Sequence, residues 1–221
     1  MLKQKFKTSG HLKAKLMSSK QKGFSLMEVL IAMIIIAIGL LGFLSLQLAS
    51  INSNQDGLAR TQATLIAQEL GSAIRGNRDY IFSSGGNSEY LVQANYETCD
   101  VKPACTGAGG LCLPEEQARV DAWQACQTIK GFTTDVTNDD ALLNGQIRVG
   151  CTDRDASDAD ACSPGSTLNI YTFWANNVRR EDVGSVGIPE NQRCNNFAAS
   201  IGLDYATIGD PVDCIVIDIM P

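Results

Sequence analysis

Histidine is almost absent from this chain of 221 residues, since His11 is the only one. The sequence also lacks a nucleophile elbow and a phosphate-binding loop, and its acidic residues fall mostly in predicted loops without an assignable catalytic pair. General acid–base and nucleophilic catalysis draw most often on histidine or on such motifs. We therefore predict that the protein is not an enzyme and that it needs no cofactor.

Acidic residues are missing from the first 23 positions, whereas basic residues are concentrated there. Seven of the 18 basic residues lie in this segment, namely Lys3, Lys5, Lys7, Lys13, Lys15, Lys20 and Lys22. Beyond it, eleven basic residues remain against 24 acidic ones, a net charge of −13. Nucleic-acid surfaces need clustered lysine and arginine. Only the pair Arg179 and Arg180 offers positive charge, and we interpret it as a solvated strand end, so no nucleic-acid partner is expected.

Cysteine is absent before position 99, and eight cysteines follow. An even number of cysteines is typical of disulfides formed in an oxidising compartment such as the periplasm. A zinc site is the alternative, but such sites usually show a C-x2-C knuckle or histidine partners. Here the two cysteines closest in sequence, Cys99 and Cys105, are six positions apart. We therefore predict four disulfides and no metal.

Charge is also absent over the 27 residues from Val29 to Gln55. The apolar first part of this run, about 20 residues, is long enough to cross a hydrocarbon core of about 30 Å. A cleavable secretory signal is the alternative, but it has a shorter apolar core that ends in an A-x-A site. The basic segment should stay on the cytoplasmic side of the membrane. The run is therefore predicted to be a membrane span with the rest of the chain in the periplasm.

A single acid, Glu28, stands at the front of the apolar run. A carboxylate within a membrane helix costs about 2.5 to 3.5 kcal/mol on insertion scales, so it usually has a partner; an interfacial carboxylate at the helix end is the simpler alternative. The string Gly23-Phe24-Ser25-Leu26-Met27-Glu28-Val29-Leu30 resembles the class III signal of type IV prepilins. The resemblance implies that prepilin peptidase cuts between Gly23 and Phe24 and methylates the amine of Phe24. It also implies that Glu28 pairs with this amine on a neighbouring subunit.

The apolar run carries a further resemblance. Ala37-Ile38-Gly39-Leu40-Leu41-Gly42, followed by Leu46-Gln47, is similar to the same region of the type IV pilus modification proteins, the PilV minor pilins. Gly39 and Gly42 have a second interpretation, because small residues let membrane helices pack closely. Ser45 stands where many major pilins have a helix-kinking proline.

The fold that this resemblance implies is α+β, a type IV pilin fold with a long N-terminal helix packed on an antiparallel sheet. Helical spacing predicts one helix from Ser25 to about Arg75 and, after Pro114, a second helix over 114–129. The region 83–110, rich in Gly, Ser and Asn, is predicted to be mostly loop. Strands are predicted at 146–151, 167–174 and 212–220. The predicted core residues are Leu58, Leu65, Ile66, Leu70, Ala73 and Ile74 on the first helix, with Trp123 and Trp174.

Eight cysteines allow 105 pairings, and geometry reduces this number. If 114–129 is helical, Cys112 and Cys126 are about 20 Å apart, beyond the Cα separation of roughly 7 Å that a disulfide permits. The preferred pairs are therefore Cys105–Cys112, Cys99–Cys126, Cys151–Cys162, which would close an acidic loop, and Cys194–Cys214.

The acidic loop between Cys151 and Cys162 spaces oxygen donors like the first half of a calcium loop. The candidate ligands are Asp153, Asp155, Ser157, Asp158 and Asp160. The loop lacks the glycine at the sixth position and the distal glutamate of an EF-hand. A solvated acidic loop is the preferred interpretation.

These observations predict a leader peptide over 1–23, a transmembrane and polymerisation segment over 24–52, and a periplasmic head over 53–221. Met17 is an alternative start. The expected function is that of a minor pilin that primes pilus assembly, held in the inner membrane before assembly and located in the pilus, near its tip, afterwards. Its expected partners are other minor pilins, the major pilin, the inner-membrane assembly machinery and prepilin peptidase. A minor pseudopilin of type II secretion and a pilus-displayed adhesin are the alternatives.

Overall fold

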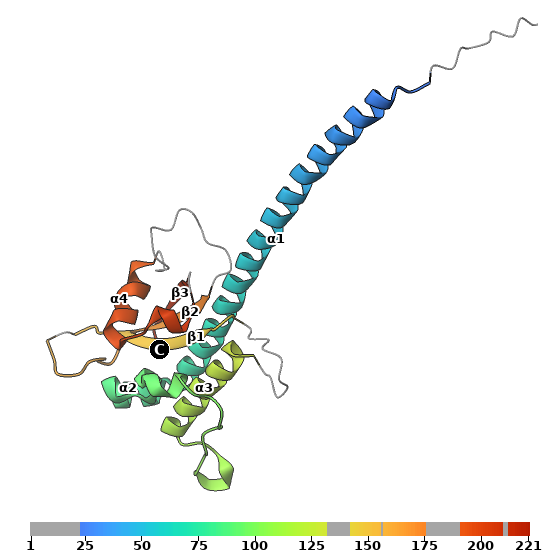
Figure 1. Cartoon of the computed structure of the whole chain (residues 1–221). Helices are drawn as coiled ribbons and strands as arrows, with labels where there is room; N and C mark the ends of the chain where they lie inside the picture. The colour runs from blue at the N-terminus through green and yellow to red at the C-terminus, as the bar shows by residue number, and fades with distance from the viewer. Residues whose placement is uncertain (1–22, 132–141, 156, 176–190, 210–211) are drawn as a thin grey trace, which may run out of the picture. The chain divides into compact units, whose positions relative to one another are not determined.

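The computed structural model describes residues 23–131, 142–155, 157–175, 191–209 and 212–221. The predicted leader up to residue 22, with His11 and Met17, and the pair Arg179 and Arg180 lie outside these residues. The chain divides into two units, Met1–Gln47 and Leu48–Pro221. The described part contains four α-helices and three strands (Figure 1): α1 Leu26–Gly76, α2 Arg78–Ser84, α3 Pro114–Ile129, α4 Gln192–Ile201, β1 Gln146–Thr152, β2 Thr167–Ala175 and β3 Val212–Ile219.

Helix α1 begins and ends where the local sequence predicts. The Ser25 carbonyl accepts the N–H groups of Glu28 and Val29, which starts the helical ladder. At the other end, the Asn77 N–H donates to the carbonyls of Ala73 and Ile74, directly after Gly76. The helix from Leu26 to Gly76 confirms the predicted long N-terminal helix.

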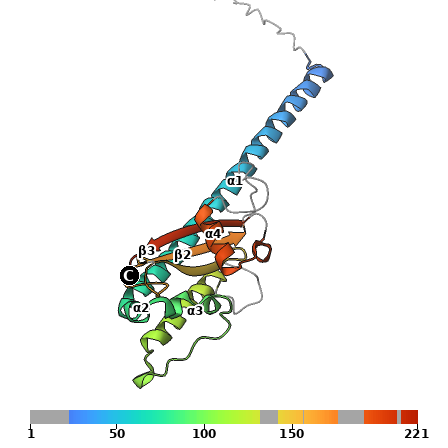
Figure 2. The ribbon, with the colours of Figure 1, turned by 90° about the vertical axis from the view of Figure 1, so that its left-hand side faces the viewer.

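The three strands form one antiparallel sheet in the order β1-β2-β3 (Figure 2). Val149 of β1 pairs with Ile170 of β2, which in turn pairs with Ile217 of β3. β2 is the central strand and is buried from Leu168 to Trp174. The predicted α+β fold class is thereby confirmed.

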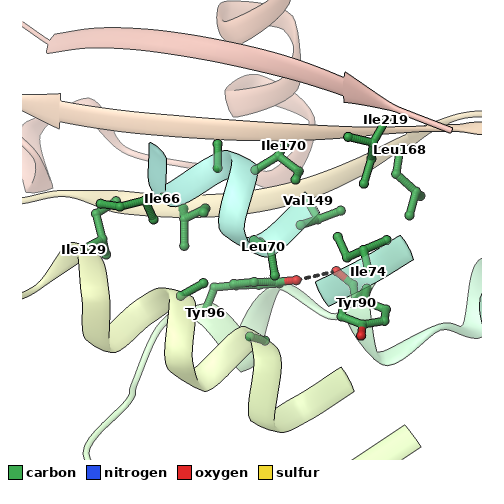
Figure 3. Packing of buried hydrophobic residues seen from close by; sticks show 14 of the residues in the cluster. Ile66, Leu70, Ile74, Tyr90, Tyr96, Ile129, Val149, Leu168, Ile170 and Ile219 are labelled. Atoms are coloured by element: carbon green, nitrogen blue, oxygen red, sulfur yellow. Dashed lines mark hydrogen bonds between the residues drawn. The ribbon is translucent and has the colours of Figure 1, made fainter. Parts of the chain in front are cut away.

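One face of the sheet packs against the C-terminal part of α1 and against α3. Ile66, Leu70 and Ile74 of α1 lie against this face in Figure 3, and the same cluster includes Leu168, Ile170, Ile219, Val149 and Ile129. Gly71 is the point of closest approach, because a Cβ built there would lie 3.3 Å from Cγ2 of Ile219. The Tyr96 hydroxyl donates to the Tyr90 carbonyl at 2.9 Å within this core. These contacts hold helix and sheet together within the head.

The predicted core stripe of α1 was partly wrong. The side chains of Leu58 and Leu65 are 58% and 59% exposed, and the buried residues of the helix are Ala63, Ile66, Ala67, Leu70, Gly71 and Ile74. Successive helical residues point about 100° apart, so Leu65 lies well to one side of Ile66. The small residues Ala63 and Ala67 complete the buried stripe because they let the helix approach its neighbours closely. Trp174 is buried as predicted, whereas Trp123 is only partly buried.

The other face of the sheet is covered by α4, which the sequence analysis did not predict. Tyr171 and Phe197 stack with ring centroids 3.9 Å apart, and Phe173 and Ala198 belong to the same cluster. Arg193 donates to both carboxylate oxygens of Asp218, at 2.9 and 2.7 Å.

The predicted loop over 83–110 contains more helix than expected. Its first part forms the end of α2 and short 3-10 helices at Gly85–Asn87, Glu89–Leu91 and Gln93–Tyr96. These turns bury Tyr90 and Tyr96 in the main core. The aromatic anchors explain why a segment rich in small polar residues is ordered.

Four disulfides join the eight cysteines. They are Cys99–Cys126, Cys105–Cys112, Cys151–Cys162 and Cys194–Cys214, with Cα–Cα distances of 5.8, 4.3, 5.9 and 6.4 Å. These are the same pairs that spacing and geometry favoured in the sequence. They join the 83–110 region to α3, close two loops, and attach α4 to the sheet.

Candidate functional site at the N-terminus

The residues that resemble a processing signal lie directly before and within the first turn of α1. Gly23, Phe24 and Ser25 precede the helix, and the Phe24 side chain is 83% exposed. Glu28 lies in the first turn and is also exposed. A carboxylate at this position interacts favourably with the positive end of the helix dipole. The structure therefore presents Gly23, Phe24 and Glu28 together on an accessible segment.

Gly23 has no steric role within the described chain. A Cβ built at this position meets no atom within 4 Å. Neither crowding nor a left-handed backbone conformation demands a glycine here, because its φ angle lies outside the left-handed range. Packing and backbone conformation within the described residues therefore set no requirement for glycine at this position.

The first unit exposes a continuous set of large apolar side chains. They include Leu30, Ile31, Ile34, Ile35, Ile38, Leu41, Leu44 and Leu46, each more than half exposed. Helix α1 is long and apolar enough to cross a membrane. So much apolar surface is unfavourable in water. It fits a lipid environment or contacts with other apolar helices.

Small residues interrupt this apolar surface without breaking the helix. Gly39 and Gly42 have open space where a Cβ would stand, so packing within the described chain does not require them. Another helix could approach closely at these two positions. The Ser45 hydroxyl donates to the Leu41 carbonyl at 2.9 Å, which satisfies its polar group within the helix.

The acidic loop closed by Cys151–Cys162 is organised around its own serines. Asp153 accepts hydrogen bonds from the Ser163 N–H and hydroxyl and from the Ser166 hydroxyl, at 2.9, 2.8 and 3.0 Å. Asp155 accepts from Ser157. The hydrogen bonds from Ser163 lower the pKa of Asp153 to about 2.

The two remaining acids of this loop also bind protein donors. The Ser163 hydroxyl shares its single hydrogen between Asp153 and Oδ2 of Asp158, each 2.8 Å away, and Asp160 accepts the Gly86 N–H at 2.7 Å. In the part of the chain that the structure describes, no group of three or more His, Cys, Asp or Glu side chains could hold a metal ion. The candidate calcium ligands therefore serve to order the loop and to join it to the segment around Gly86.

Residues 18–44 match the family model of the prokaryotic N-terminal methylation motif. No curated protein and no solved structure matches the chain. The match includes Gly23, Phe24 and Glu28, and it ends before Ser45.

Proposed function

We propose that this chain is a minor pilin of a type IV pilus, acting in the complex that primes pilus assembly. The methylation motif, the apolar helix and the α+β head support a type IV pilin-like or pseudopilin subunit. The motif also implies processing by prepilin peptidase and membership of a pilus or pseudopilus assembly. The observation that carries the proposal is that Gly23, Phe24 and Glu28 stand in this motif at the start of α1.

The proposed sequence of events follows from the charges. Before processing, α1 anchors the protein in the inner membrane with the head in the periplasm. Cleavage between Gly23 and Phe24 creates an amine four residues before Glu28. Two opposite charges that are costly in lipid can neutralise each other when helices of neighbouring subunits stack. Assembly would thus be coupled to the pairing of Glu28 with the Phe24 amine of the next subunit.

We further propose that the head acts by binding and not by catalysis. The described carboxylates with lowered pKa values are structural groups. Thr106 and Leu113 hydrogen-bond Glu116 at the start of α3, and Arg193 pairs with Asp218. The lowered pKa of each group stems from these hydrogen bonds. Such fully bonded carboxylates have little capacity left to act on a substrate.

The finer assignment rests on the resemblance to PilV minor pilins at Ala37–Gly42 and Leu46-Gln47. The alternative is a minor pseudopilin of type II secretion, which shares the motif and the anchoring helix. Partner choice should reside in the head, because the helix is common to all such subunits.

Deletion of the gene tests the proposal. Loss of surface pili and of twitching motility, both restored by the wild-type gene, is the expected result. Loss of secreted exoenzymes with normal piliation would instead establish the pseudopilin alternative. Co-purification of the major pilin and of other minor pilins with the detergent-extracted protein provides an independent check on its partners.

A further inference from the structure

The head contains a cavity of about 520 Å³ that no feature of the processing signal explains. The 93–97 segment, Lys130 and the first part of β1 line one part of it. The end of α4, the residues that follow it and Thr207 line the rest. Its volume is in the range of small-ligand sites, and it lies wholly within the second unit. It can therefore hold a short polypeptide segment or a small molecule.

Arg148 of β1 is the buried charged group among the residues that line this cavity, and it is only 5% exposed. Its guanidinium donates to the carbonyls of Ile147 and Tyr96, at 2.9 and 3.2 Å, and to Oε1 of Gln146 at 3.0 Å. All three acceptors are neutral, and within the described residues no carboxylate forms an ion pair with Arg148. Burial accordingly lowers the pKa of this guanidinium. The charge of the exposed Glu97 carboxylate offsets this lowering only in part, and Glu97 does not pair directly with the guanidinium. A carboxylate bound directly to Arg148 would compensate its buried charge better.

Gln93 supplies a second group that lacks a partner. Its amide nitrogen donates to the carbonyls of Leu91 and Val149, at 3.1 and 2.8 Å, which fixes the side chain. Its Oε1 is buried and has no hydrogen-bond partner. A buried acceptor without a donor costs free energy. A ligand of this cavity should therefore carry an N–H or O–H donor for Oε1 of Gln93 as well as a carboxylate for Arg148.

The other residues that line the cavity favour a ligand with one carboxylate over a polyanion. Lys130 is exposed and adds positive charge, while the exposed carboxylates of Glu97 and Asp204 would repel a polyanion. Ile201 and Leu203 add apolar surface. A polypeptide segment with one carboxylate combines the acceptor that suits Arg148 with backbone N–H donors that suit Gln93.

We propose that this cavity binds a carboxylate-bearing segment of a partner polypeptide. Arg148 binds the carboxylate, and Oε1 of Gln93 accepts an N–H of the same segment. The carboxylate comes from an acidic side chain or from a chain terminus, which present the same chemistry to Arg148. The site deepens the proposed function by giving the head a means of partner choice, but binding itself requires neither cleavage at Gly23 nor piliation.

The experiment uses the full-length protein in detergent and three pentapeptides with acetylated N-termini. The first two are alanine peptides with an amidated C-terminus, and their central residue is glutamate in one and glutamine in the other. The third peptide is all alanine and has a free C-terminal carboxylate. Binding is followed by calorimetry and by methyl NMR of Ile201 and Leu203. At least one carboxylate peptide should bind about tenfold or more tightly than the glutamine peptide, with shifts at both methyl-bearing residues. Which one binds identifies the source of the carboxylate.

Two variants and their controls locate the site. Arg148→Gln should abolish the preference for the carboxylate, whereas Arg154→Gln, the same change at an exposed arginine outside the cavity, should keep it. If Arg148→Gln does not fold, Lys130→Gln should still weaken binding of the carboxylate peptide, and Lys102→Gln should not. Equal binding of the glutamate, glutamine and free-carboxylate peptides, no binding at millimolar concentration, or the absence of shifts at Ile201 and Leu203 would overturn the proposal. A protein that binds the peptide but keeps its leader would refute the proposed function and leave this site intact.

Discussion

At the scale of single residues, the proposed assembly mechanism depends most on the charge of Glu28. It is the only charged residue between Gly23 and Gln55 and lies in the first turn of α1. Its carboxylate costs little at a membrane surface but several kcal/mol within the hydrocarbon region. A counter-charge created by cleavage would remove most of this cost. Glu28 should therefore matter for assembly and not for cleavage.

Replacement of Glu28 by alanine tests this role. We expect Glu28→Ala to be cleaved as efficiently as the wild type, because the cut lies five residues away, but to fall several-fold in its yield in pilus or minor-pilin complexes. Gel mobility reports cleavage, and pull-down of partner subunits reports assembly. Glu69→Ala, which removes an exposed acid of the same helix within the head, serves as the control. Normal complex formation by Glu28→Ala would refute the charge-pairing role.

Asp153 shows how a single carboxylate orders a loop. Its pKa is lowered to about 2, first by the Ser163 backbone N–H and then by the Ser163 hydroxyl. The unfolded chain should titrate near the ordinary value of about 3.9. A lowered pKa in the folded state means that the stabilisation is complete above this value and is lost as the pH falls towards about 2.

The Ser163→Ala variant should raise the pKa of Asp153, but not to its ordinary value, because the backbone N–H of residue 163 still donates. Carboxyl 13C NMR titration measures the change directly. Ser157→Ala is a matched control, since Ser157 hydrogen-bonds Asp155 and should affect the pKa of that residue instead. An unchanged titration of Asp153 in Ser163→Ala would show that the hydroxyl contributes nothing.

At the scale of elements, α1 changes its role along its length. Its first part exposes large apolar side chains, whereas from Ala63 onwards a narrow stripe of small and branched residues is buried. Gly57 and Gly71 illustrate the difference. A Cβ at Gly57 meets no atom within 4 Å, but one at Gly71 lies 3.3 Å from Ile219 and 3.5 Å from Ile170.

Larger residues at these two positions should therefore change the free energy of unfolding in opposite directions. Gly57→Ala should raise the free energy of unfolding by about 0.5 to 1 kcal/mol, because alanine favours helix. Gly71→Leu should lower it by roughly 1 to 3 kcal/mol, because a larger side chain separates the helix from the sheet. Chemical denaturation of the detergent-extracted protein measures both values. A Gly71→Leu variant as stable as the wild type would contradict the close helix–sheet contact.

The same scale shows what could be predicted from the sequence. α1, α3 and the three strands follow from strong local patterns: a long apolar run, Pro114 with two acids in the first turn, and β-branched segments. Helix α4 was missed although Asn191 caps its start and Gly202 ends it in a left-handed conformation, because the segment is only ten residues long. It is held by Cys194–Cys214 and by the stack of Phe197 on Tyr171. Periodicity also predicts that a segment is helical more readily than which of its faces is buried, which explains the error at Leu58 and Leu65.

Of the two candidate sites, the N-terminal processing signal could be predicted from the sequence and the cavity at Arg148 could not. Gly23, Phe24 and Glu28 could be found because their signal is contiguous in sequence and independent of the fold. Arg148 could not, because an arginine in a strand usually faces solvent. Its burial depends on the packing of the 93–97 segment and of α4 around β1, and no local pattern encodes that arrangement.

At the scale of the whole molecule, the chain combines an apolar anchoring helix with an acidic, disulfide-bonded head. Without its first 23 residues the protein has a net charge of −13, which argues against a surface for nucleic acid. Disulfides each contribute about 2 to 4 kcal/mol, which suits a head outside the reducing cytoplasm. These properties fit a subunit that works by contact with other subunits once it has been processed at Gly23.

Intact-mass and N-terminal peptide mass spectrometry of the membrane-extracted protein tests this central claim most directly. The account predicts a mature chain that begins at Phe24 and carries a methyl group on its N-terminal amine. The same protein from cells without prepilin peptidase should keep its leader and lack the methyl group. An intact leader in wild-type cells, or a cut near Ala49 at the end of the apolar run, would contradict the account.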